Sequence, residues 1–148
     1  MRWLGLLAFC ATLPPAPAAA QPSCYPPGAF RIAGAPFNCF SATTCIDSAL
    51  NDLGRAAPGQ GIILNSSLNY YPPGVIAFVF GHECMHFTGI MSEQAADCQA
   101  VKIGRNQGFI NQFVLQQICQ SVYFSPGDWT HFPGPARCQN MIACFNSP

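Results

Sequence analysis

Nine cysteines in a chain of 148 residues are the feature that most constrains how this protein can fold. One of them, Cys10, lies in an apolar amino-terminal stretch, and the others are spread from position 24 to position 144. Without Cys10, eight cysteines remain. An even number of cysteines in a small exported domain is typical of a disulfide framework that replaces part of a large core. The chain has no Cys-x-x-Cys pair, which argues against a zinc knuckle. We therefore expect up to four disulfides.

The first twenty residues have the pattern of a secretory signal peptide. Arg2 supplies a positive start, residues 4–13 are apolar, and residues 18–20 are three alanines that suit cleavage before Gln21. Prolines interrupt the apolar stretch, which makes it too short for a membrane-spanning helix. We expect a mature single domain at residues 21–148, secreted or periplasmic, without stable insertion into a membrane.

Charged side chains are few, with six basic and six acidic residues in the chain. They form no basic stripe for nucleic acid and no polybasic patch for anionic lipid. Nucleic acid is therefore not an expected partner. Half of the acidic residues, Glu83, Glu93 and Asp97, lie close together in the sequence. This clustering in a chain with so little charge indicates a functional site.

Hydrophobic spacing predicts a helix-dominated α+β domain with a small sheet. An irregular, disulfide-held arm is expected at residues 21–44 and a short strand, Gly-Ile-Ile-Leu, at residues 61–64. Helices are expected at residues 45–55, 74–88, 92–106 with Ser92 as N-cap, 110–121, and from Pro135 onward. Their predicted buried faces include Ile46, Ala49, Leu50 and Leu53 in the first helix, Ile110, Phe113, Val114 and Ile118 in the fourth, and Cys138, Met141, Ile142 and Phe145 in the last.

The segment His-Glu-Cys-Met-His at residues 82–86 matches the zinc-protease pattern H-E-x-x-H. Helical residues four apart are separated by about 40° around the axis, so His82 and His86 can reach one metal ion. Glu83 lies about 100° from His82, beside the metal, where a carboxylate can hold a water molecule. Cys84 lies on the opposite face and is expected in a disulfide, with Cys98 as one candidate partner.

A third metal ligand is expected from the helix that follows Gly89, a residue that can turn the chain back across the metal. Glu93 is near the start of this helix, and its longer side chain favours it over Asp97. Asp97 then suits a hydrogen bond to a ligand imidazole, or an ion pair with Arg137. The alternative is that both carboxylates belong to a solvated helix face.

His131 leaves two interpretations open. It donates a hydrogen bond to the developing oxyanion of a reacting carbonyl, or it is a loop histidine with no role. As a fourth protein ligand it would close the position that a catalytic zinc keeps for water, so that arrangement is less favoured.

These residues resemble the gluzincin metallopeptidases, and in particular the small exported bacterial members called minigluzincins. The likeness is carried by His-Glu-Cys-Met-His followed by Glu-Gln-Ala-Ala-Asp at residues 93–97, and it extends to residues 62–65, 78–84, 96–98, 104–108 and 127–137. It covers about residues 60–144 and implies zinc ligation by His82, His86 and Glu93 with Glu83 catalytic. Two departures are the short gap between His86 and Glu93 and the insertion of Phe132 between His131 and a proline.

The sequence therefore predicts a minimal zincin-like, disulfide-stabilised zinc endopeptidase that hydrolyses peptides or proteins. Glu83 would be the general base, and the strand at residues 61–64 would be an edge strand that pairs with an extended substrate. The alternative is a disulfide-rich exported binding or structural protein with a non-catalytic zinc site. Glu83 favours catalysis, because a structural site needs no base at that position.

Overall fold

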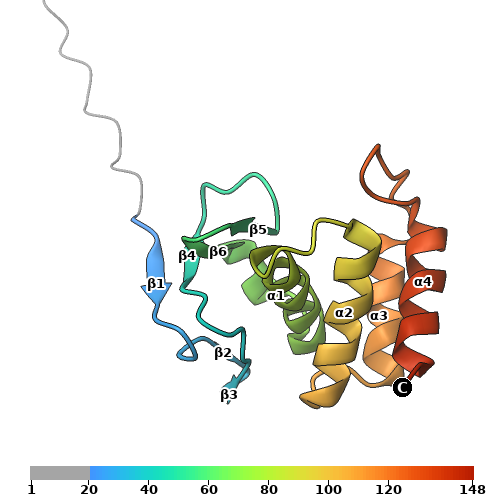
Figure 1. Cartoon of the computed structure of the whole chain (residues 1–148), viewed down its shortest axis with the longest axis horizontal. Coiled ribbons are helices and arrows are strands. Elements are labelled where there is room, and N and C mark those ends of the chain that lie inside the picture. Colours follow the sequence, from blue (N-terminus) through green and yellow to red (C-terminus); the bar gives the residue numbers. More distant parts are fainter. Residues whose placement is uncertain (1–20) are drawn as a thin grey trace, which may run out of the picture.

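The structure is a computed structural model that describes residues 21–148, so the expected signal peptide at residues 1–20 lies outside the described residues. Strands occupy the first half of the domain and helices the second (Figure 1). The strands are β1 (Ser23–Tyr25), β2 (Arg31–Ile32), β3 (Ala35–Pro36), β4 (Thr44–Asp47), β5 (Gly54–Ala57) and β6 (Gly61–Asn65). After a 3-10 turn, η1 (Ser66–Tyr70), come the helices α1 (Pro73–Phe87), α2 (Glu93–Asn106), α3 (Gln112–Val122) and α4 (Gly134–Asn146). The expected helix-dominated α+β class is confirmed.

The main sheet has the strand order β1-β4-β6-β5, and β2 and β3 form a separate hairpin. β6 runs parallel to β4 and antiparallel to β5. The expected strand at residues 61–64 is therefore confirmed, but the expectation that it forms a sheet edge is wrong. Ile62 and Leu64 are fully buried, which suits a central strand covered on both sides. The open edge next to the helices is β5.

The helix expected at residues 45–55 is wrong, because this segment forms β4, a loop and the start of β5. Cys45 is bonded to Cys24 on β1, which fixes the segment as a strand between β1 and β6. The side chain of Asp47 accepts the Ala49 N–H at 2.8 Å, a local bond that competes with helix formation. Of the residues whose spacing suggested a helix, Ile46 of β4 and Leu53 of the loop pack against the core separately, and Ala49 is exposed.

The other four predicted helices are confirmed, with boundaries shifted by one or two residues. Ser92 caps α2 as expected, since its side chain accepts the Ala95 N–H at 3.3 Å. Gly81 of α1 faces Ala100 of α2, where an added Cβ would lie 3.4 Å from the Ala100 Cβ. Small residues thus let the two helices that carry the expected ligands pack closely.

Three side chains assigned to buried helix faces point to solvent instead, and one of them is Ala49 in the loop before β5. Phe113 is 66 % exposed and Ile142 is 38 % exposed. In α3 the inward face is formed by Leu115 and Ile118, and Phe113 lies off this face. In α4 Met141 is fully buried and its neighbour Ile142 lies at the surface.

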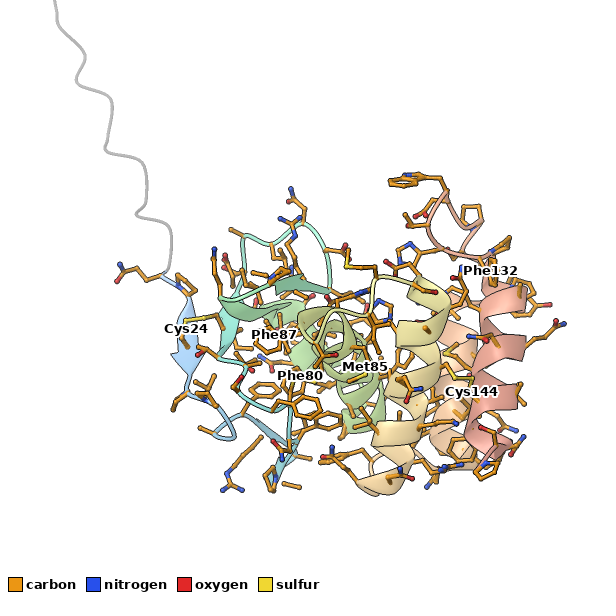
Figure 2. The ribbon with its side chains drawn as sticks, viewed as in Figure 1. Cys24, Phe80, Met85, Phe87, Phe132 and Cys144 are labelled. Carbon is orange, nitrogen blue, oxygen red and sulfur yellow. A yellow bond between two sulfur atoms is a disulfide. The ribbon has the colours of Figure 1, made fainter. Side chains whose placement is uncertain are left out.

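Four disulfides join the elements, as the even number of cysteines predicts. The pairs are Cys24–Cys45, Cys39–Cys84, Cys98–Cys144 and Cys119–Cys138. They reach across the domain, since Cys24 on β1 and Cys144 on α4 lie at opposite ends of it (Figure 2). The suggested pair between Cys84 and Cys98 is wrong, because Cys84 faces the amino-terminal arm and Cys98 faces α4. Within residues 21–148, none of the helices has the length and hydrophobicity needed to cross a bilayer.

Candidate metal centre

A tight turn between α1 and α2 brings three donor side chains together. Gly89 adopts a positive φ of 96°, and the Ile90 N–H donates to the Met85 carbonyl at 3.0 Å. Glycine takes this conformation at little cost, so the chain reverses immediately after α1. Glu93 at the start of α2 therefore lies against His86 near the end of α1.

The donor atoms of His82, His86 and Glu93 all lie within 4.8 Å of one another. Glu93 Oε2 is 3.0 Å from His82 Nε2 and 3.3 Å from His86 Nε2, and the two Nε2 atoms are 2.9 Å apart. Ligand atoms about 2.1 Å from a tetrahedral zinc ion are themselves separated by about 3.4 Å. Two imidazoles and a carboxylate at these separations could hold a metal ion.

Each of these histidines is oriented through its other ring nitrogen. His82 Nδ1 donates to Asp97 Oδ1 at 2.9 Å, and His86 Nδ1 donates to the Ile90 carbonyl at 2.7 Å. Such bonds leave Nε2 free to bind a metal ion and raise the basicity of the imidazole. Asp97 lies beside His82 and outside the group of donor atoms. This agrees with the expectation from side-chain length, by which the shorter Asp97 contacts an imidazole and the longer Glu93 reaches the donor group.

Arg137 of α4 completes this chain of polar contacts. Its Nε and Nη2 donate to the two oxygens of Asp97 at 2.8 and 2.7 Å. Asp97 is almost fully buried, and a bidentate arginine is the partner that a buried carboxylate requires. Asp97 therefore takes both expected partners at once, His82 and Arg137.

The charges of the centre suit a cation. Burial disfavours the charged form of His82, but hydrogen bonds with Asp97 and Glu93 outweigh burial and raise its pKa to about 9. The hydrogen bond with His82 lowers the pKa of Glu93 to about 2. The imidazole and carboxylate therefore form an ion pair at neutral pH, and a metal ion that binds here displaces a proton.

Glu83 lies beside the donor group rather than within it. Burial raises the pKa of its carboxyl, while nearby His82 and His86 and a hydrogen bond with the backbone of Ala56 oppose the rise. Its Cγ would be only 2.7 Å from a Cβ added at Gly54 of β5, so the absence of a side chain there makes room for it. Glu83 lines the same cavity as the three donors, and its role as a base stays a prediction.

His131 is brought to the centre by the loop between α3 and α4. Its Nε2 lies 2.9 Å from Glu93 Oε2, and its Nδ1 lies 3.1 Å from Asp128 Oδ2. Asp128 also accepts the backbone N–H groups of Thr130 and His131, which hold the loop in a tight turn. These backbone and hydroxyl donors lower the pKa of Asp128.

Sequence reasoning missed Asp128. Its signal is an aspartate three residues before a histidine and two before a threonine, a spacing that suits a side-chain-capped turn. All the residues expected at the site, including His131, are brought to one centre, and their catalytic roles stay predictions.

Two cavities with shared lining residues open onto this centre, with volumes of about 330 and 380 Å³. His82, Glu83, His131 and Gly54 line both. The first cavity continues along β5, and the second runs between α1 and the end of α3. A molecule bound across the centre thus has space on both sides of Glu83.

The chain matches no family model, no curated protein and no solved structure, so the case for its function depends on the residues of the site.

Proposed function

We propose that the protein is a secreted or periplasmic zinc-dependent endopeptidase, similar in its site to the gluzincins. The observation that carries the proposal is the position of Glu83. Its carboxylate lies next to a His82, His86 and Glu93 donor group and faces the same cavities. The four disulfides support an oxidising compartment.

Each residue of the site has a separate role in the proposed peptide hydrolysis. Zinc, when bound, polarises a carbonyl and lowers the pKa of a coordinated water molecule to about 7. Glu83 then takes a proton from the attacking water and passes it to the leaving nitrogen. His131 donates a hydrogen bond to the carbonyl oxygen as negative charge develops there. Asp97 and Arg137 hold His82 in position.

The open edge of β5 is the surface on which we propose that the peptide lies. The Leu53 carbonyl accepts from the Asn65 N–H at 2.9 Å, so the backbone of Leu53 faces β6. Backbone groups in an antiparallel strand alternate in direction, which turns those of Gly54 and Ala56 toward the open edge. An extended peptide can add to this edge and bring its scissile bond past Glu83.

The second cavity suggests which residue fits beside the scissile bond. One part of its wall is apolar and is formed by Leu53, Tyr71, Val75, Phe78, Val79 and Val122. Polar residues away from the donor group, Asp52, Ser121, Ser125 and Asp128, line another part. We propose that the apolar part receives a bulky, largely apolar side chain of the substrate.

A mixed peptide library tests the proposal when cleavage is followed by mass spectrometry, with and without a chelator. We expect cleavage next to bulky apolar residues, lost with chelator and restored by zinc. Glu83→Gln is expected to lower the rate by about 10² to 10⁴ while the protein keeps its metal.

Wild-type turnover in Glu83→Gln would contradict the role of Glu83. Stoichiometric zinc without cleavage of any peptide in the library would favour the alternative, an exported binding or structural protein with a non-catalytic zinc site.

A further inference from the structure

Three histidines surround Glu93 in the same way, although only two of them belong to the expected ligand set. His82, His86 and His131 place their Nε2 atoms 3.0, 3.3 and 2.9 Å from Glu93 Oε2. Each also has its Nδ1 next to an oxygen. These oxygens are Asp97 Oδ1 for His82, the Ile90 carbonyl for His86 and Asp128 Oδ2 for His131. Zinc-binding histidines almost always have such a partner, and His131 meets this condition as His82 and His86 do.

The position of His131 differs from theirs in one respect. It lies outside the group whose donor atoms are all within 4.8 Å of one another. It comes from the loop between α3 and α4, which projects past the end of α4, and its side chain is 32 % exposed (Figure 1). His82 and His86, by contrast, are fixed on a buried helix. The His131 Nε2 is 2.9 Å from Glu93 Oε2, and it would join the other three donors if the imidazole moved toward His82 and His86.

We propose that His131 is an exchangeable fourth zinc ligand. In the resting protein its Nε2 closes the metal site, and it leaves that position when a peptide carbonyl or another ligand enters. The inference rests on the proposed zinc site and goes beyond it by adding a closed state. A zinc ion with four protein ligands has no position for water, so the closed state is inactive.

The turn around Asp128 keeps the released imidazole close to the centre. Asp128 Oδ1 accepts the N–H groups of Thr130 and His131 at 2.7 and 2.8 Å, and Gln94 of α2 donates to the Thr130 carbonyl at 3.4 Å. His131 therefore moves as a side chain on an anchored loop. After release it is still within reach of the carbonyl oxygen to which it is proposed to donate.

X-ray absorption of the zinc-loaded full-length mature chain tests the proposal, because multiple scattering counts the bound imidazoles. We expect the wild type to show His82, His86 and His131 as ligands and His131→Ala to lose one imidazole. Adding acetohydroxamate, a small zinc-binding probe, should remove the same imidazole from the wild type. Chelator competition should show zinc binding weakened about tenfold or more in His131→Ala. Trp129→Ala is the matched loop control, since this side chain is 96 % exposed, and it should behave as wild type.

The possible results separate this inference from the proposed function. Two imidazoles in both wild type and His131→Ala, with equal zinc affinity, would overturn the exchangeable ligand and leave the zinc peptidase intact. A third imidazole that persists in saturating acetohydroxamate would overturn the exchange. A wild-type chain that binds no zinc would overturn the proposed function itself, and with it this inference.

Discussion

At the scale of single residues, the centre is held by a series of side-chain contacts that runs from Arg137 to the candidate metal position. Arg137 holds Asp97, Asp97 orients His82, and His82 presents its Nε2 beside Glu93. Each contact satisfies a polar group that burial would otherwise leave unpaired. These contacts therefore position His82 and Glu93 before a metal ion binds.

Glu93 and Asp97 are expected to respond differently to mutation, because we propose Glu93 as a direct ligand, whereas Asp97 contacts the centre through His82. Glu93→Ala should largely empty the site. Asp97→Ala should weaken zinc binding by about 10- to 100-fold and leave a site that can still be loaded. Titration against a chelator of known affinity measures both. Complete loss of zinc in Asp97→Ala alone, with Glu93→Ala near wild type, would reverse the assignment.

Much of this residue-scale arrangement could be predicted from sequence. The separation of His82 and His86 by one helical turn fixes their common direction, and side-chain length distinguishes Glu93 from Asp97. Asp128 could not be predicted in the same way. Asp128 matters because its loop brings His131 to Glu93, and His131 lies 38 residues beyond Glu93 in the sequence. No local periodicity reveals a contact between residues so far apart.

At the scale of elements, helices were predictable and strand order was not. The caps and apolar spacing of α1 to α4 are local signals, so Ser92 and Gly89 could be interpreted directly. The sheet depends on pairing between distant segments, and β6 became central because β4 pairs with it in parallel. The prediction of a helix at residues 45–55 failed for the same reason: apolar spacing there did not reveal the strand pairing or the Cys24–Cys45 bond.

Proline substitutions in β5 are expected to separate activity from stability. The N–H of Ala56 faces the open edge and donates to the Glu83 carboxyl, so Ala56→Pro should keep the fold, as prolines do on edge strands, and impair peptide cleavage by removing a contact of Glu83. The N–H of Arg55 faces β6, so Arg55→Pro should lose a ladder hydrogen bond and destabilise the domain more than Ala56→Pro.

Cleavage kinetics and urea unfolding, measured side by side on both proline variants, check this prediction. Equal destabilisation of the two would mean that the backbone of β5 does not alternate as inferred. Wild-type cleavage by a folded Ala56→Pro would show that the contact between Ala56 and Glu83 is not needed for cleavage.

At the scale of the whole molecule, two hydrophobic clusters are joined through α1. One cluster packs α1 against the strands and the amino-terminal arm, and the other packs α1 against α2, α3 and α4. The Cys39–Cys84 bond ties the arm to α1 at the residue that follows Glu83. The arm thus supports α1 from the side opposite the candidate metal centre.

Replacing Cys39 and Cys84 by serine is expected to lower the free energy of unfolding by about 2–5 kcal/mol. The matched control replaces Cys24 and Cys45, whose bond closes a shorter loop, with a separation of 21 residues instead of 45. Loop entropy makes the control less costly by about 0.7 kcal/mol, and the burial of Cys84 widens the difference. Urea unfolding measures both, and a larger loss in the control would show that the arm does not support α1.

The two walls of the site come from separate stretches of the chain. The residues that surround the metal position lie between His82 and Arg137, and the opposite wall is β5. Sequence drift in β5 and its loops can therefore reshape what the cleft accepts without altering the metal donors. For the peptidase that we propose, inherited changes in the strands would diversify targets while the chemistry stays constant, and directed evolution of new cleavage preferences should begin there.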